Sequence, residues 1–271
     1  MSVHDDVKKV TTLELNRMKE AGSRIASLTA YDAAFSYALD QAGADFILVG
    51  DSLGMVVQGR RTTIPVTMDE MIYHTQLVNR GVKRAMVMAD MPFMSYSSPQ
   101  DCLVNAARLM KEGGAEIVKL EWGALEIPMV QRLTECGIPV CAHLGLTPQA
   151  IHKYGAYRVQ GREAGTAQRM IDDAQALEEA GADVLLLECV PTPLAAQITQ
   201  NASVPVIGIG AGDQVDGQIL VLYDILDIYP GKRARFSKNY MEGSSSIQIA
   251  IKRYVEDVKQ GAFPTAEYAF E

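Results

Sequence analysis

The sequence has few cysteines, and they stand apart from one another. Only four occur among 271 residues, and none forms a Cys-x-x-Cys pair. Zinc ribbons and dithiol redox sites need such pairs, so the sequence predicts neither. Each cysteine lies in or beside an apolar stretch, where a free thiol behaves as a small hydrophobic side chain. We therefore treat the cysteines as packing residues.

Basic residues are also scarce. The chain has 25 Lys and Arg against 33 Asp and Glu, which gives a formal net charge of -8. Nucleic-acid binding needs clustered positive side chains, so this balance argues against a nucleic-acid partner. An anionic small molecule needs only one or two local cations, so this composition is compatible with such a substrate.

Long apolar runs are missing as well. The first ten residues, MSVHDDVKKV, lack the apolar core of a secretion signal. No uncharged apolar run reaches the ~20 residues that a membrane helix needs. Hydrophobic residues nevertheless make up 48% of the chain, enough for a large core. We expect a soluble, cytoplasmic protein with no membrane partner.

Three similar segments recur along the chain. In each, a helical pattern ends at a glycine, and an acid follows: Asp45, Glu116 or Asp183. A short apolar run comes next and leads to a second acid. Such a glycine ends a helix, and such an apolar run is typical of a buried strand. The copies lie roughly 70 residues apart, about two units of an eightfold barrel of ~250 residues.

Further strands are expected between and around these copies. They are predicted over residues 24–29, 84–90, 138–143 and 204–210, with a weaker eighth strand over 223–228. Eight strands with helices between them favour an α/β fold, a single (β/α)₈ TIM barrel over residues 1–271. An open, doubly wound sheet is the alternative. Thr11 and Glu14 predict a capped helix before the first strand, and 244–260 predicts a C-terminal helix.

Four acids follow or end strands of this barrel. They are Asp51, Asp90, Glu121 and Glu188. In such barrels the catalytic groups lie at the carboxyl ends of the strands. Carboxylates held close together raise each other's pKa unless a cation lies among them, and oxygen ligands without a His or Cys set favour Mg²⁺. Strands 2 to 4 place the first three acids on one side of the mouth, whereas Glu188 stands apart and can act as a base. For Asp51 alone, a turn cap is the competing interpretation.

Three other side chains are candidates for substrate contacts. Ser52 follows Asp51 directly, and Lys119 points the same way as Glu121 because they are two residues apart on one strand. The Lys119 ammonium can hold a substrate carboxylate, or the pair can be purely structural. His143 ends strand 5, a position that makes a functional role as plausible as the structural role more common for a lone histidine.

The glycine-rich segment Gly208-Ile-Gly-Ala-Gly212 resembles a phosphate loop at the end of strand 7. It lacks the lysine of a nucleotide-binding loop and the full dinucleotide pattern, so we do not interpret it as nucleotide binding. Close backbone packing at the barrel mouth explains it equally well.

This set of residues permits one kind of chemistry in particular. Mg²⁺ can chelate a 2-oxo acid through its keto oxygen and one carboxylate oxygen, and so stabilise the enolate that forms when a proton leaves the adjacent carbon. A positioned carboxylate such as Glu188 would be the general base. The enolate would then attack an electrophile.

The motifs resemble one known family along nearly the whole chain. They are Leu28-Thr-Ala-Tyr-Asp32, Val49-Gly-Asp-Ser-Leu-Gly54, Asp90-Met-Pro-Phe93, Val118-Lys-Leu-Glu121, His143-Leu-Gly-Leu-Thr-Pro-Gln149, Gly208-Ile-Gly-Ala-Gly212 and Asp216-Gly-Gln218. Together they resemble the 3-methyl-2-oxobutanoate (ketopantoate) hydroxymethyltransferases of pantothenate biosynthesis, in the phosphoenolpyruvate/pyruvate-like barrel superfamily.

The resemblance implies a reaction and a site. A one-carbon unit would pass from 5,10-methylenetetrahydrofolate to 3-methyl-2-oxobutanoate, giving 2-dehydropantoate, in a cytoplasmic homodecamer. Mg²⁺ would be held by Asp51, Asp90 and Glu121, the last of these either directly or through water. Asp51, Ser52, Asp90 and Lys119 would bind the 2-oxo acid, and Glu188 would accept the proton.

Two departures and two competing functions qualify this resemblance. The family usually has a Gly where this chain has Ala142, and a His-Asp pair where it has Tyr223-Asp224, which puts a role of that pair in doubt.

A Mg²⁺-dependent carbon–carbon lyase or mutase of the phosphoenolpyruvate mutase and isocitrate lyase type is the enzymatic alternative, although no Cys here precedes Gly-His. A metabolite-binding barrel without catalysis would predict a broken acid set, which the sequence does not show.

Overall fold

Parallel strands form a closed barrel in the computed structural model, which describes residues 7–121, 123–228 and 233–271. Within these residues the eight strands are β1 (Ile25–Thr29), β2 (Phe46–Val49), β3 (Met86–Asp90), β4 (Ile117–Glu121), β5 (Val140–Gly145), β6 (Val184–Glu188), β7 (Val206–Ile209) and β8 (Gly217–Leu220). Each strand pairs with the next, and β8 returns to pair with β1. The predicted barrel is confirmed, and the open sheet is wrong. The first six residues of the expected domain, 1–271, lie outside the described residues.

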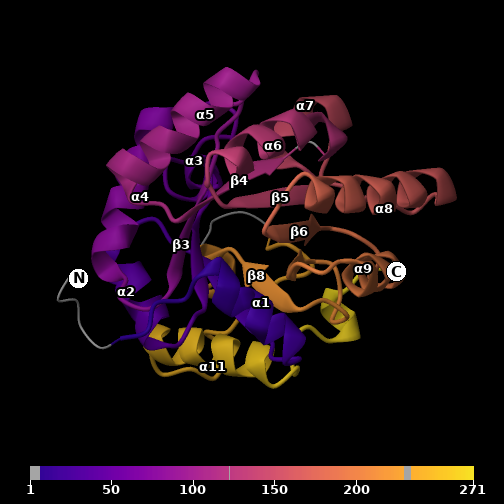
Figure 1. Ribbon diagram of the computed structural model, residues 1–271. Coiled ribbons are helices and arrows are strands. Elements are labelled where there is room, and N and C mark those ends of the chain that lie inside the picture. Colours follow the sequence, from indigo (N-terminus) through magenta and orange to yellow (C-terminus); the bar gives the residue numbers. More distant parts are fainter. Residues whose placement is uncertain (1–6, 122, 229–232) are drawn as a thin grey trace.

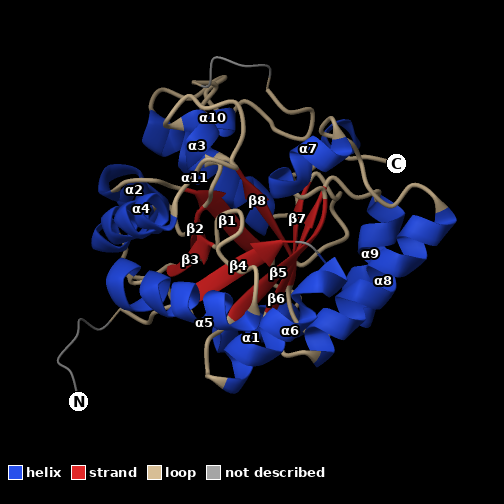
Figure 2. Cartoon of the chain, turned by 90° about the horizontal axis from the view of Figure 1, so that it is seen from above, coloured by secondary structure: helices blue, strands red, loops and turns tan. Residues whose placement is uncertain are grey.

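Helices surround the barrel, as Figure 2 shows from above. They are α1 (Thr12–Glu20), α2 (Ala33–Gln41), α3 (Leu53–Val56), α4 (Met68–Gly81), α5 (Pro99–Arg108), α6 (Ile127–Glu135), α7 (Ile151–Tyr154), α8 (Ala164–Glu179), α9 (Thr192–Asn201), α10 (Leu222–Ile225) and α11 (Ile247–Lys259). A helix follows every strand except β7, which connects directly to β8 through the described residues 210–216. No helix among the described residues is both long and apolar enough to cross a membrane.

The helices at the two ends of the chain lie where the sequence predicts them. The Thr11 side chain accepts a hydrogen bond from the Glu14 amide and so caps α1, although the Glu14 carboxylate bonds to Lys8 and does not complete a capping box. The Val10 amide donates to the Arg84 carbonyl just before β3, which holds the start of α1 against the amino ends of the strands. At the other end α11 lies beside α2 (Figure 1), and the Tyr254 hydroxyl donates to the buried Ser27 carbonyl of β1.

A repeated pair of hydrogen bonds sets the register at the amino ends of the strands. The acid directly before each even-numbered strand accepts a hydrogen bond from a backbone N–H of the preceding odd-numbered strand. The acid's own N–H donates to the carbonyl of that same residue. The four acid–residue pairs are Asp45 with Ala26, Glu116 with Val87, Asp183 with Val140, and Asp216 with Val206. The acids that mark the sequence repeats therefore hold neighbouring strands in a fixed alignment.

The predicted eighth strand over 223–228 is wrong. The strand is Gly217–Leu220, and Leu222–Ile225 forms the short helix α10. Gly217 allows close approach to β1, because a Cβ there would lie 2.5 Å from the Ile25 carbonyl oxygen. A four-residue strand that begins Gly-Gln has little of the β-branched and aromatic character that identifies strands in a sequence.

The glycine-rich segment after β7 packs closely against neighbouring side chains. A Cβ on Gly210 would lie 2.8 Å from the Phe236 ring, and one on Gly212 would lie 2.3 Å from the Thr192 hydroxyl. Both glycines also have positive φ angles, which side chains other than Gly rarely adopt. Close backbone packing is therefore sufficient to explain this motif.

Candidate active site

The predicted site residues meet at the carboxyl end of the barrel. Asp90, Glu121 and Glu188 are the last residues of β3, β4 and β6, and Asp51 lies two residues beyond β2. Strand pairing sets Asp90 beside Lys119 and Glu121 beside His143. All of the predicted site residues, Ser52 included, line one cavity of about 560 Å³.

Lys119 is the charged centre of this group. Its Nζ lies 2.9 Å from Asp90 Oδ1 and 3.7 Å from Glu121 Oε1, and the three side chains are almost fully buried. Burial alone would lower the pKa of Lys119, but Asp90, Glu121 and Asp51 together raise it, so the ammonium stays charged. The predicted Lys119–Glu121 pair is present, although the closer partner of Lys119 is Asp90.

The two aspartates are held together through the backbone. The Asp51 amide donates to Asp90 Oδ2 over 3.0 Å. Gly50 permits this turn, because a Cβ there would lie 2.6 Å from the Ser52 hydroxyl. Ser52 in turn lies 2.9 Å from the Tyr31 hydroxyl. Burial, followed by the charge of Asp90, raises the pKa of Asp51 to about 7, and burial also raises the pKa of Asp90. A turn cap alone does not describe Asp51, whose side chain faces the cavity.

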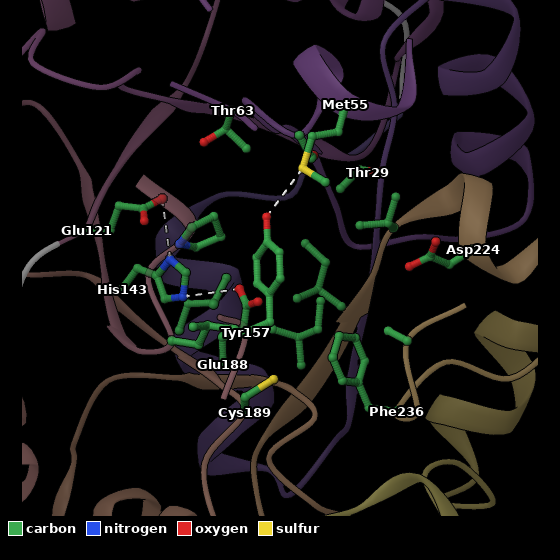
Figure 3. Close-up of a pocket in the computed structure, with 18 of the residues that line it drawn as sticks. Thr29, Met55, Thr63, Glu121, His143, Tyr157, Glu188, Cys189, Asp224 and Phe236 are labelled. Carbon is green, nitrogen blue, oxygen red and sulfur yellow. Dashed lines mark hydrogen bonds and ion pairs between the residues drawn. The ribbon is translucent and has the colours of Figure 1, made fainter. Parts of the chain in front are cut away.

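His143 connects the lysine to Glu188. Its Nδ1 lies 3.2 Å from Lys119 Nζ, and its Nε2 lies 3.5 Å from Glu188 Oε2 (Figure 3). Burial, helped by the charge of Lys119, lowers the pKa of His143 well below its usual value, so the ring is neutral. An ammonium has no lone pair, so Nδ1 must be the acceptor from Lys119, and the proton of the ring is on Nε2. The protonated ring nitrogen is therefore the one that lies nearer Glu188, and among the described residues it has no hydrogen-bond partner.

Glu188 lies among apolar groups at the end of β6. Its side chain is 15% exposed, and Leu186, Cys189 and Ile209 line the cavity near it. Burial raises the pKa of Glu188 to about 8, and Lys119 offsets part of this increase. A carboxylate with a raised pKa is a stronger base than an exposed one, which suits it to accept a proton from carbon.

Gln149 contacts two of the predicted acids, although the sequence suggested no role for it. Its Nε2 donates to Asp51 Oδ2 over 3.0 Å and to the Met91 carbonyl over 2.9 Å. Its Oε1 accepts from the Tyr96 hydroxyl over 2.5 Å, and its backbone N–H donates to Glu121 Oε2 over 3.1 Å. One residue thus fixes acids from two different strands. In the sequence, the one indication of a role for Gln149 is its place at the end of the His143–Gln149 motif. Its contacts with the acids depend on how that loop folds back over the barrel.

We expect Gln149→Glu to lower kcat/KM by about tenfold or more, because the isosteric change turns a buried donor into an acceptor facing Asp51 and the Met91 carbonyl. Steady-state kinetics and thermal melting of both proteins test this. Gln168→Glu, at an exposed position on α8, is the matched control and should leave both measurements unchanged. Wild-type kinetics in the Gln149 variant would show that Gln149 does not position the acids.

The ionisation of Glu188 also affects stability. Its pKa is raised on folding, so the folded protein loses stability as the pH rises from the unfolded value of about 4.5 toward 8. In metal-free protein, Glu188→Gln should therefore raise the melting temperature at pH 8 and have little effect below pH 4.5. Melting curves across this pH range provide the measurement, and an equal effect at all pH values would contradict the assignment.

The donor set is compatible with a divalent cation. Four carboxylates, Asp51, Asp90, Glu121 and Glu188, face Lys119, so the cluster carries excess negative charge when it is ionised. No three His, Cys, Asp or Glu side chains among the described residues group as a ready-made metal site. Mg²⁺ needs only one or two protein carboxylates when water and substrate complete its shell. Asp51 and Asp90 can supply these carboxylates, although both oxygens of Asp90, like both oxygens of Glu121, also face protein groups.

These features define a (β/α)₈-barrel enzyme with a buried carboxylate–lysine site at the carboxyl ends of its strands. The family model described as ketopantoate hydroxymethyltransferase matches residues 9–266. The chain therefore belongs to the ketopantoate hydroxymethyltransferase family and is a transferase.

Individual relatives agree over nearly their whole length. The 3-methyl-2-oxobutanoate hydroxymethyltransferase of Alkalilimnicola ehrlichii is 60% identical over 263 residues, which cover 97% of this chain and 95% of that protein. The 3-methyl-2-oxobutanoate hydroxymethyltransferase 2 of Hahella chejuensis is 54% identical over 96% of this chain and 98% of that protein.

Solved structures share the fold at low sequence identity. A putative phosphonomutase from Burkholderia cenocepacia has a TM-score of 0.63 at 17% identity and covers 80% of this chain and 94% of its own. A phosphonopyruvate hydrolase complex has a TM-score of 0.60 at 12% identity and covers 95% of this chain and 92% of its own. A 2,3-dimethylmalate lyase of the PEP mutase/isocitrate lyase superfamily has a TM-score of 0.56 at 17% identity, covering 77% of both chains. These likenesses confirm the predicted barrel fold.

Proposed function

We propose that the chain transfers a hydroxymethyl unit from 5,10-methylenetetrahydrofolate to 3-methyl-2-oxobutanoate and so forms 2-dehydropantoate. Relatives at 54–60% identity bear the name of this hydroxymethyltransferase. The observation that carries the proposal is a single cavity in which a buried ammonium and a basic carboxylate, Lys119 and Glu188, lie on either side of the neutral His143.

In this mechanism Lys119, Ser52 and His143 orient the 2-oxo acid, with the ammonium facing the substrate carboxylate. Asp51 and Asp90 would hold Mg²⁺ directly, and Glu121 would contribute through water. When bound, the cation would draw charge from the keto oxygen and so make the adjacent C–H more acidic.

Glu188 then accepts the proton from C3 of the 2-oxo acid. The electron pair left on C3 forms the new bond to the methylene carbon of the folate as one of the two C–N bonds of that carbon breaks. Water then displaces the second folate nitrogen and supplies the hydroxyl oxygen. The two folate nitrogens take up the proton from C3 and one proton from water, and tetrahydrofolate leaves. His143 Nε2 lies 3.5 Å from Glu188 Oε2, and a nearby N–H favours the charged form of this carboxylate. The apolar surroundings limit the access of water to the intermediate.

A homodecameric assembly and a cytoplasmic location are further parts of this proposal. They rest on the family resemblance alone. Sedimentation of the purified protein tests the assembly, and a mass well below ten copies of the 29.5 kDa chain would contradict it.

The deciding experiment measures 2-dehydropantoate formed from 3-methyl-2-oxobutanoate and methylenetetrahydrofolate, with and without Mg²⁺. We expect folate-dependent turnover that a chelator abolishes and Mg²⁺ restores. Absence of product would contradict the proposal. Carbon–carbon bond cleavage without folate would instead support the lyase alternative, for which the solved structures supply only a shared fold.

A further inference from the structure

The cavity extends well beyond the acids. From β2 to β6 it is lined by the carboxylates and Lys119, whereas on the β7 and β8 side it becomes an apolar slot. The walls of this slot are Val159, Ile209, Ile219, Val221 and Phe236. A short branched 2-oxo acid held at Lys119 leaves the slot open for a second ligand.

Asp224 lies at the far end of this slot. Figure 3 shows its carboxylate turned toward the cavity, on the opposite side from Glu121 and His143. Among the described residues, no hydrogen bond to this carboxylate is found. Burial raises the pKa of Asp224, and the Arg233 guanidinium, which also lines the cavity, lowers it, but the ion pair of Arg233 is with Asp227. The carboxylate is partly buried and has no hydrogen-bond partner among the described residues, so a ligand with N–H donors would stabilise it.

Positive charge lies at the outer rim of the same cavity. Arg158 and Arg235 both line it and are exposed. The Arg235 guanidinium stacks over Phe270 at 5.3 Å from the ring centre, and Phe270 in turn packs edge-on against Phe236. The slot therefore has a carboxylate at its far end, apolar walls, and guanidinium groups at the outer rim of the cavity.

We propose that this slot binds the pterin ring of the one-carbon donor, with Asp224 accepting hydrogen bonds from the 2-amino and N3–H groups. Arg158 and Arg235 then face the carboxylates of the glutamyl tail. This inference rests on the proposed function, since it names where the folate of that reaction binds. Two parallel N–H donors match the two oxygens of a carboxylate, and the flat bicycle matches the apolar walls and Phe236.

The 2-oxo acid is a poor occupant of the same position. It offers only acceptor oxygens and a negative charge, which Asp224 would repel. The slot and the lysine site thus select ligands of opposite hydrogen-bonding character. A folate in the slot also brings its reactive carbon into the cavity that contains Glu188.

The test compares Asp224→Asn and Asp224→Ala with wild type in steady-state kinetics and in equilibrium titration with tetrahydrofolate. We expect KM for methylenetetrahydrofolate and the dissociation constant of tetrahydrofolate to rise about tenfold or more, while KM for the 2-oxo acid changes less than about twofold. Asp213→Asn is the control, because Asp213 is an exposed residue outside the cavity. Arg158→Gln with Arg235→Gln should weaken tetrahydrofolate binding by a smaller factor.

The outcomes separate this inference from the proposed function. Wild-type turnover with unchanged folate parameters in both Asp224 variants would overturn the inference alone. Equal increases in the KM values of both substrates would also overturn it, because they would indicate general disruption of the site. If wild type shows no turnover, tetrahydrofolate titration still decides: binding that weakens in Asp224→Asn supports the slot, and no binding by wild type rejects it.

Discussion

Replacing Glu188 by glutamine should lower kcat by about 10²- to 10⁴-fold, the range in which a general base contributes. The amide keeps the size and polarity of the side chain but cannot accept a proton from C3. Affinity for the 2-oxo acid should change little, because His143 lies between Glu188 and Lys119, the group proposed to bind the substrate carboxylate. Single-turnover kinetics and substrate titration of the purified variant separate these two effects.

A matched control is Glu179→Gln, which makes the same chemical change at an exposed position on α8. It should retain wild-type turnover. Exchange of the C3 hydrogen of 3-methyl-2-oxobutanoate with D₂O gives a second readout of proton removal. If Glu188→Gln turned over at the wild-type rate, Glu188 would not be the base.

Replacing Asp90 by asparagine should weaken the binding of Mg²⁺ and of the 2-oxo acid together, each by about tenfold or more. Asp90 contacts Lys119 through one oxygen and the Asp51 amide through the other, so an amide must place its NH₂ group against one of these two donors. The change therefore disturbs both the proposed cation donors and Lys119, which we propose faces the substrate carboxylate.

Isothermal titration with Mg²⁺ and then with the 2-oxo acid provides the measurement. Asp172→Asn, on the outer face of α8, is the control and should preserve both affinities. Normal affinity for both ligands in Asp90→Asn would reject the assigned role, and loss of only one would show that the two sites are independent.

The sequence predicted the barrel and the positions of its acids because both follow from local rules. A glycine after a helix, an apolar run and a final carboxylate identify β4 and β6, and the geometry of the barrel then brings Glu121 and Glu188 to one rim. Asp90 beside Lys119 follows from strand pairing, which needs only the order of the strands.

Other parts of the site depend on contacts that no local pattern contains. Gln149 reaches Asp51 only because its loop folds back across the barrel, and the neutral state of His143 arises from burial next to Lys119. Residues 223–228 looked apolar enough for a strand, but the pairing with β1 uses Gly217–Leu220 instead. The position of Tyr223, where the family usually has His, is now defined: its ring packs edge-on against Tyr31, at 5.6 Å between centroids.

The acids that align the strand pairs have a consequence for sequence variation. Asp45, Glu116, Asp183 and Asp216 have backbone partners, whereas Glu188 at the opposite rim is poorly solvated and has no backbone partner among the described residues. In a library of amide replacements scored separately for abundance and growth, replacement of the first four acids should lower abundance. Replacement of Glu188 should leave abundance intact, or increase it, and abolish growth without pantothenate.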